Sequence, residues 1–154
     1  MDIKKVLVIS LVLIMIVLSS SIVSAGWFDN GVNVNGIEFN LPDGYKEAEG
    51  NNFADNYLSM GYKGETGIYE DENGNLIWIS VLNENPEGTE LSLDDIVVSA
   101  TDFEDLKNNT EIAGKTGISY KFSTPSQNAF VYVEDGKLID IRVPDGVNFE
   151  DIIK

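Results

Sequence analysis

Two stretches decide the fold: TGISYKF at residues 116–122 and NAFVYVEDGKLIDIRV at residues 128–143. Apolar and polar side chains alternate along the first, which is the pattern of a half-buried β-strand, and the second has apolar residues on both sides of a central turn. Asp135-Gly136 interrupts the second stretch and suits the two-residue turn of a hairpin, because both positions of that turn need a positive φ. The turn sets the expected cross-strand pairs, which are Glu134 with Lys137, Tyr132 with Ile139, Phe130 with Ile141 and Asn128 with Val143. We therefore predict three antiparallel strands, against which the rest of the chain packs.

The alternation also sorts these side chains onto two faces of the sheet. We predict that one face belongs to the core and carries Ile118, Tyr120, Phe122, Phe130, Tyr132, Ile139 and Ile141. The opposite face mixes charged with apolar side chains, which are Lys121, Val131, Val133, Leu138, Asp140 and Arg142. This mixture is too apolar for a solvated surface and too polar for a core. We expect a ligand or a partner to bind this second face.

The N-terminal half predicts further strands. Asn35-Gly36 is a second two-residue turn signal, and apolar residues flank it in alternation. Residues 56–63 and 66–70 also alternate as strands do. Leu76–Leu82 is apolar on both faces, which is typical of a central strand that is covered on both sides.

Two aromatic residues form a further candidate surface. A tight turn at Asn73-Gly74 would pair Tyr69 with Trp78, so that both rings lie on one face of the sheet. Such a pair can stack on a sugar or another flat ligand. Alternatively, a helix over residues 92–107 covers both rings.

That helix is predicted from its start signal and its apolar spacing. Ser92 and Asp95 resemble a capping box, with Asp in place of the usual Glu. Apolar residues then follow at helical intervals, although the pattern is weaker over Thr101–Asp105, where the helix could break. A short amphipathic helix is expected at residues 148–154. The predicted fold class is α+β: a single domain with a twisted antiparallel sheet of about 6–8 strands, one main helix and a short C-terminal helix.

Residues 1–25 have the organisation of a secretory signal peptide. Lys4 and Lys5 precede the apolar run Val6–Leu18, and small residues lead to Val23-Ser24-Ala25, so we expect cleavage before Gly26. The apolar run is shorter than the roughly 20 residues that span a bilayer; retention as an uncleaved anchor is the alternative. We expect a leader at residues 26–31, a domain at 32–154, and a location in the extracellular space or the cell envelope without membrane insertion after cleavage.

The charge restricts the possible partners. Removing the signal peptide takes away Asp2, Lys4 and Lys5, which leaves 8 basic and 25 acidic residues, or a formal charge of −17. Such a surface repels phosphate backbones and anionic lipids. We therefore exclude nucleic acid as a partner and expect a monomer. The charge favours cations or a basic partner, and the alternative is a solvated anionic surface whose self-repulsion keeps the protein monomeric.

The absence of His and Cys from the sequence limits the chemistry. It removes Ser-His-Asp and Cys-His catalysis, and it removes the usual zinc and copper ligand sets. We therefore predict that the protein is not an enzyme. The alternative is a carboxylate-dependent hydrolase of an extracellular or wall polymer, which would need two carboxyl groups within about 10 Å in a cleft.

Two local motifs predict further sites. Asp71, Asn73 and Asn75 stand at the alternate positions from which a loop presents oxygen ligands, which predicts weak binding of Ca²⁺; the remaining EF-hand positions do not match. A domain that cations stabilise is thus a third functional alternative. Asn108 begins the sequon Asn108-Asn109-Thr110 and is a candidate for glycosylation.

The motif FNLPDGY at residues 39–45, followed by a meander with an inserted helix, resembles a group of small secreted archaeal proteins of unassigned function. Their layout is similar to the extrinsic oxygen-evolving-complex protein and its relatives. The resemblance covers residues 32–154 and implies docking to partners rather than catalysis. Function inferred from a fold is an analogy, and no site residue can be transferred. The sequence thus predicts a secreted or envelope-associated binding or accessory domain whose partner it does not identify.

Overall fold

The computed structural model describes residues 31–49, 56–97, 103–123 and 126–154. Gly31–Lys154 form one compact unit. The predicted signal peptide and all but the last residue of the predicted leader lie outside the described residues, so both stay predictions.

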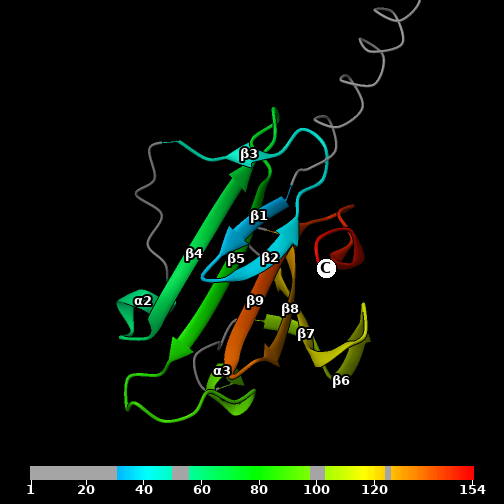
Figure 1. Ribbon diagram of the computed structural model, residues 1–154. Helices are drawn as coiled ribbons and strands as arrows, with labels where there is room; N and C mark the ends of the chain where they lie inside the picture. The colour runs from blue at the N-terminus through cyan, green and yellow to red at the C-terminus, as the bar shows by residue number, and fades with distance from the viewer. Residues whose placement is uncertain (1–30, 50–55, 98–102, 124–125) are drawn as a thin grey trace, which may run out of the picture. The chain divides into compact units, whose positions relative to one another are not determined.

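The described chain forms two antiparallel sheets (Figure 1). The larger has seven strands in the order β3-β4-β5-β9-β8-β7-β6, and the smaller is the hairpin β1-β2. The strands are β1 (Gly31–Val34), β2 (Ile37–Asn40), β3 (Lys46–Glu47), β4 (Lys63–Glu70), β5 (Leu76–Glu84), β6 (Phe103–Ile112), β7 (Lys115–Ser123), β8 (Ser126–Glu134) and β9 (Lys137–Pro144). The helical elements are α2 (Asn56–Ser59), α3 (Asp94–Val97) and the 3₁₀ turn η1 (Phe149–Asp151).

The hairpin β8-β9 confirms the predicted register. Glu134 pairs with Lys137 and Phe130 with Ile141, and Asp135 and Gly136 both have positive φ. The hairpin at Asn35-Gly36 is confirmed as well. In both cases the turn residues alone determine which side chains face each other, because a two-residue turn leaves no freedom in the register.

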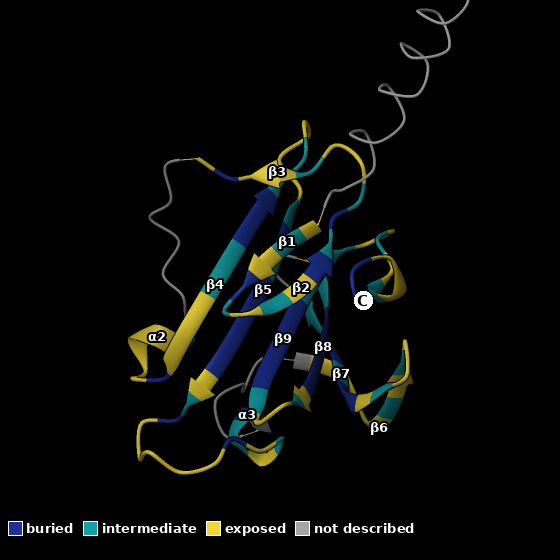
Figure 2. Cartoon of the chain, viewed as in Figure 1, coloured by how far each residue is buried: buried dark blue, intermediate teal, exposed yellow. Residues whose placement is uncertain are grey.

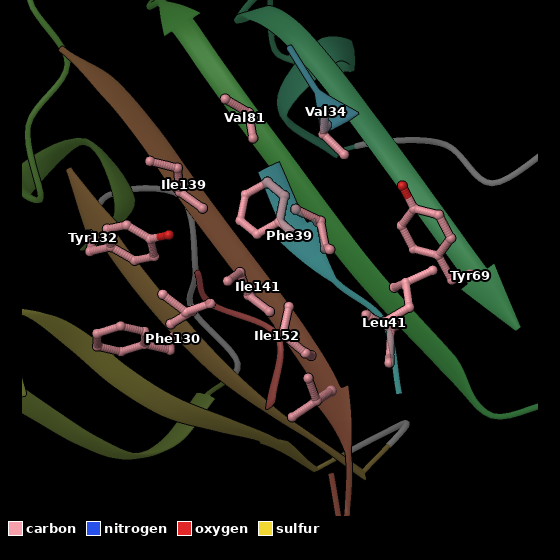
Figure 3. Packing of buried hydrophobic residues seen from close by; sticks show 14 residues of the cluster. Val34, Phe39, Leu41, Tyr69, Val81, Phe130, Tyr132, Ile139, Ile141 and Ile152 are labelled. Atoms are coloured by element: carbon pink, nitrogen blue, oxygen red, sulfur yellow. The ribbon is translucent and has the colours of Figure 1, made fainter. Parts of the chain in front are cut away.

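The hairpin β1-β2 and η1 cover one face of the large sheet, which we call face A (Figures 1 and 2). Its core is a cluster of aliphatic and aromatic side chains from β2, β5, β8, β9 and the C-terminus (Figure 3). Phe39, Phe130 and Ile152 are all fully buried there. Asn40 donates its backbone N–H to the carbonyl of Ile152 at 2.8 Å, which joins β2 to the C-terminus.

The opposite face of the sheet, face B, carries a second apolar cluster. Leu82, Val131 and Leu138 contribute from the sheet, and Tyr57 and Ile96 pack on them from the segments of α2 and α3. Strand β5 is therefore buried on both sides, as its sequence predicted. The two short helices cover face B in place of one long helix.

The predicted α+β fold class is wrong, because the described chain is mostly β and its helices are single turns. Instead of a helix over 92–107, the described residues form the single turn α3 and then the edge strand β6. The predicted start is correct: Asp95 accepts hydrogen bonds from the backbone N–H and the hydroxyl of Ser92. Among residues 103–107, Asp105 has the lowest helix propensity and most of the others are good helix formers, so pairing with β7 rather than local propensity decides the conformation. Residues 98–102 lie outside the described residues.

Two shorter predictions are also wrong. Residues 56–63 are not a strand, because α2 occupies Asn56–Ser59 and the chain turns at Gly61, whose φ is +92°. The expected C-terminal helix at 148–154 is η1, after which Ile153 bridges to Phe39. A helix of one or two turns has little intrinsic stability, so contacts with the sheet determine both conformations.

The register of β4 with β5 differs by one residue from the predicted one. Tyr69 pairs with Ile77, and Ile68 pairs with Trp78. The connection is a five-residue loop rather than a tight turn, and Asp71 closes it through hydrogen bonds to two backbone N–H groups. A shift of one residue moves every side chain to the other face. Tyr69 and Trp78 thus lie on opposite faces and form no platform.

The predicted face of the β7 side chains is also wrong, because the register of β7 with β8 differs from the expected one. Ser123 pairs with Ser126, and Tyr120 therefore stands opposite Ala129. This places Ile118, Tyr120 and Phe122 on face B, together with Asp140 and Arg142, rather than on face A. Lys121 correspondingly lies on face A.

Edge strand β6 is irregular. Its register with β7 shifts twice, between Glu104 and Lys107 and again between Lys107 and Thr110. Asp105 and Asn109 have φ values of 54° and 55° at these shifts. The strand therefore contains two bulges, each with a non-glycine residue in the left-handed region.

Gly117 in β7 stands where the sheet has no room for a side chain. A Cβ atom there would lie 2.1 Å from the carbonyl oxygen of Val131. We expect Gly117→Ala to destabilise the protein by about 2–3 kcal/mol, because backbone atoms must move. Gly114→Ala is the control: it has a positive φ but no atom within 4 Å, and its cost should be about 1–2 kcal/mol. Urea denaturation measures both; equal losses would contradict this packing.

Candidate functional site

A buried ion pair lies on face B. Asp140 and Arg142 are two residues apart on β9, so their side chains project from the same face. Arg142 Nη2 lies 2.8 Å from Asp140 Oδ2, and Nε lies within 3.3 Å of both carboxylate oxygens. The Asp140 side chain is 1 % exposed and that of Arg142 19 % exposed. Burial opposes the charge of Arg142, but attraction and hydrogen bonds from Asp140 outweigh it and raise the Arg142 pKa overall.

Tyr57 connects this ion pair to α2. Its hydroxyl donates to Asp140 Oδ2 at 2.8 Å. Burial, and then the charge of Asp140, raise the pKa of Tyr57 far above its usual value, so the phenol remains a donor. Burial likewise raises the pKa of Tyr120, and Asp140 adds to that shift. Asp140 thus anchors α2 to the middle of the sheet.

Aromatic rings surround the guanidinium group of Arg142. Its Cζ atom lies 4.8 Å from the ring centroid of Phe122 and 5.9 Å from that of Tyr57, within the range of cation–π attraction. The ring of Tyr57 also meets that of Tyr62 edge-on, with centroids 5.5 Å apart. The ion pair is therefore built into the packing of face B and serves to position α2 and Tyr62.

Next to Tyr62 lies a groove of about 420 Å³, which we call the acidic groove. The turn after α2, the loop after β5 and the first residues of α3 form its walls, together with Ser92 before α3. Its lining includes three carboxylates, Glu87, Asp94 and Asp95, and three apolar or aromatic side chains, Met60, Tyr62 and Pro86. The groove is open to solvent rather than enclosed, so it can hold part of a partner but does not surround a small molecule.

The walls of the acidic groove are fixed by hydrogen bonds. Buried Asn85 accepts from the backbone N–H groups of Glu87 and Thr89 through Oδ1. Its Nδ2 donates to the Thr89 hydroxyl at 2.6 Å. Asp95 holds Ser92 through the capping contacts, and the Tyr62 hydroxyl contacts the Asp95 carbonyl at 3.4 Å. The loops are therefore ordered before any ligand arrives, which lowers the entropic cost of binding.

The chemistry of the acidic groove favours an organic cation. Glu87 and Asp94 are exposed and Asp95 is half-buried. Met60 and Pro86 supply apolar surface beside these charges. Lysine and arginine side chains combine an apolar stem with a cationic head in the same way.

The residues predicted for the second sheet face are only partly together. Val131, Leu138 and Asp140 are fully buried on face B, and Val133 is exposed at the end of β8. Trp78 is half-buried and pairs with Arg142 across β5 and β9. These residues share one face, as predicted, but most of them contribute to packing.

Two of the predicted residues lie elsewhere. Tyr69 is buried in the core of face A. Lys121, also on face A, pairs with Asp145 at 3.3 Å. The carboxylate of Asp145 additionally accepts from Ser126 and Asn128, so this cluster fastens the chain after β9 to the hairpin β7-β8.

The loop predicted to bind Ca²⁺ brings its three residues together. Asp71 Oδ1 accepts from the backbone N–H groups of Asn73 and Asn75, and Oδ2 accepts from Asn75 Nδ2 at 2.8 Å. Hydrogen bonds, first from the Asn75 side chain, hold the pKa of Asp71 below its usual value. A calcium ion would have to compete with these contacts. Binding of Ca²⁺ there stays a prediction.

Asn108 is exposed in β6 rather than at a helix end. It stands between the two bulges, and the Thr110 hydroxyl contacts the Lys107 carbonyl and the Ser119 hydroxyl. The sequon is thus in an exposed edge strand. Glycosylation at Asn108 stays a prediction.

Sequence reasoning missed the acidic groove and the role of Tyr57. Glu87, Asp94 and Asp95 are part of an acidic composition in which no single residue stands out. The sequence did contain a turn signal there: Asn85, Pro86 and Gly88 are turn-forming residues a few positions before the capping residue Ser92. Tyr57 was assigned to a strand, so its contact with Asp140 could not be anticipated.

Comparison with protein-family models gave no match, and comparisons with curated proteins and with solved structures gave none either. The resemblance to the secreted archaeal proteins and to the oxygen-evolving-complex fold therefore stays a prediction. Within the described ranges, none of the helices has the length and apolar character needed to cross a bilayer.

Proposed function

We propose that this protein is a secreted or envelope-associated binding domain that holds a basic side chain of a partner protein in the acidic groove. The observation that carries the proposal is that Glu87, Asp94 and Asp95 all line one groove that also has apolar walls. The domain acts by binding and not by catalysis.

Charge supports a basic partner. The formal charge of the whole chain is −16, so cationic partners are attracted from a distance and acidic ones repelled. Within the acidic groove, the ammonium or guanidinium head meets the exposed carboxylates of Glu87 and Asp94, and the methylene stem lies against Met60 and Pro86. The long-range attraction raises the association rate constant, whereas the contacts in the acidic groove select between partners.

A polymer hydrolase is the competing function, because the acidic groove contains more than one carboxylate. Acid catalysis of glycoside cleavage needs a carboxyl group in an apolar enclosure that keeps it protonated. Glu87 and Asp94 are both solvent-exposed, and Asp95 Oδ2 accepts two hydrogen bonds from Ser92. These environments support binding of a cation rather than transfer of a proton.

The test is a pair of charge-neutralising substitutions in the acidic groove. We expect Glu87→Gln with Asp94→Asn to weaken binding of a short lysine-containing peptide about three- to tenfold, since each exposed ion pair contributes up to about 1 kcal/mol. Isothermal titration calorimetry with the full chain at low and moderate salt measures the effect, and the dependence on salt should decrease in the variant.

The matched control removes two charges elsewhere. Glu72→Gln with Glu111→Gln changes the net charge by the same amount at two exposed positions outside the groove. Its affinity should stay within about twofold of the unaltered protein. Equal losses in the two double variants would mean that the peptide senses only the overall charge, and the acidic groove would then not be the binding site.

A further inference from the structure

We infer that the partner segment is amphipathic: beside the basic side chain, it carries a large apolar side chain that packs on Leu58 and Met60 at the rim of the acidic groove. This inference rests on the proposed function and adds a second determinant to it. The chemical class of the partner is therefore a protein segment with lysine or arginine next to leucine, isoleucine or phenylalanine.

Two of the four large apolar side chains that are exposed in the described chain belong to the α2 segment. Leu58 is 43 % exposed and Met60 is 49 % exposed, while Tyr57, which like Leu58 lies in α2, is 4 % exposed. Leu58 precedes Met60 by two residues, and two exposed apolar side chains this close together in the sequence are a candidate interaction surface. Met60 itself lines the acidic groove, so the apolar rim and the carboxylates are continuous.

The rim is held in place rather than loosely attached. The Tyr57 hydroxyl binds the buried carboxylate of Asp140 at 2.8 Å. The turn after α2 is closed by hydrogen bonds from Met60 N–H to the Tyr57 carbonyl and from Gly61 N–H to the Leu58 carbonyl. A Cβ atom on Gly61 would lie 3.5 Å from Pro86, which shows how closely this turn approaches the loop after β5. The apolar rim and the acidic wall therefore keep one relative placement, as a specific docking surface requires.

Charge excludes the other common occupants of an apolar rim. A second copy of this chain would bring another strongly acidic surface against Glu87 and Asp94, and an anionic lipid surface would be repelled in the same way. A purely apolar segment would leave the carboxylates without counter-charges. A segment that is both basic and apolar satisfies the two parts of the surface at once.

The experiment compares two blocked peptides of identical length and charge. Both contain two lysines, and the positions next to the lysines hold leucine in one peptide and alanine in the other. Calorimetry with the full chain should show about five- to tenfold tighter binding of the leucine peptide, from burial of its side chains. Leu58→Gln with Met60→Gln should remove this advantage while the alanine peptide binds as before.

Leu106→Gln is the matched control, because Leu106 is 40 % exposed on β6 and does not line the acidic groove. It should keep the full advantage of the leucine peptide. Met60→Gln alone provides a milder variant, and circular dichroism verifies that each variant is folded. Sedimentation at rising protein concentration tests the rival occupant, a second copy, and should show a monomer.

The outcomes separate the two proposals. If the alanine peptide binds and depends on Glu87 and Asp94, but the leucine peptide has no advantage, the acidic groove stands and the amphipathic partner is refuted. An advantage that persists in Leu58→Gln/Met60→Gln, or a dimer that these substitutions dissolve, also overturns the inference. If neither peptide binds, both proposals fail.

Discussion

Replacing Asp140 by alanine should cost about 3–5 kcal/mol of the free energy of unfolding, the largest loss that we expect from any single polar substitution in the described chain. The substitution leaves the guanidinium group of Arg142 in a largely buried site without its counter-charge. It also removes the acceptor of the Tyr57 hydroxyl. Urea denaturation at neutral pH, followed by circular dichroism, measures the loss.

Two further variants separate the charge from the hydrogen bond. Tyr57→Phe keeps the ion pair and should lose only about 1.5–3 kcal/mol, the usual contribution of a hydrogen bond to a charged group. Asp140→Leu combined with Arg142→Leu removes both charges and should recover most of the stability, since a buried pair often contributes little compared with apolar residues. If Asp140→Ala were no more harmful than Tyr57→Phe, Arg142 would not depend on Asp140.

Phe39→Ala should cost a similar amount, about 3–5 kcal/mol, because Phe39 is fully buried and its removal leaves a cavity. The ring lies between the hairpin β1-β2 and the sheet (Figure 3). Its backbone also pairs with Ile153. The loss should therefore be accompanied by faster hydrogen exchange in both the hairpin and the C-terminal segment, which mass spectrometry can follow.

The neighbouring residue supplies the control. Glu38 is exposed on the same strand and makes an ion pair of 3.3 Å with Lys154. Glu38→Ala should change stability by less than about 1 kcal/mol. If both substitutions had equal effects, the hairpin would not be docked through Phe39.

The sequence predicted the hairpins well because their determinants are local. Asp135-Gly136 and Asn35-Gly36 adopt the positive φ values that their turns need, and the registers follow directly. Where the connection was not a two-residue turn of this type, the prediction failed. The loop closed by Asp71 changed the register of β4 by one residue and thereby separated Tyr69 from Trp78.

The helix prediction failed because long-range pairing overrides local spacing. Ser92 and Asp95 begin a helix as predicted, but α3 ends at Val97. From Phe103 onward, backbone pairing with β7 stabilises the chain more than formation of a helix would. Apolar residues at helical intervals are compatible with a helix, but the contacts of the segment with the rest of the fold determine whether the helix forms.

The candidate site was predictable only in part for the same reason. Asp140 and Arg142 were correctly placed on one face, since alternation on a strand is local information. Their partner Tyr57 is 83 residues from Asp140 in the sequence. The acidic groove combines loops that meet only in three dimensions, and its carboxylates are not distinguishable by residue type from the other acidic residues of the chain.

The two bulges of β6 have a consequence for behaviour in concentrated solution. An outermost strand with a regular row of N–H and C=O groups can recruit a strand from another molecule, which is how fibrils and amorphous aggregates begin. In β6, Asp105 and Asn109 interrupt that row twice within five residues. An incoming strand would find no continuous ladder on this side of the sheet. Together with the strong mutual repulsion of the molecules, this irregularity should keep the protein dispersed where it is abundant.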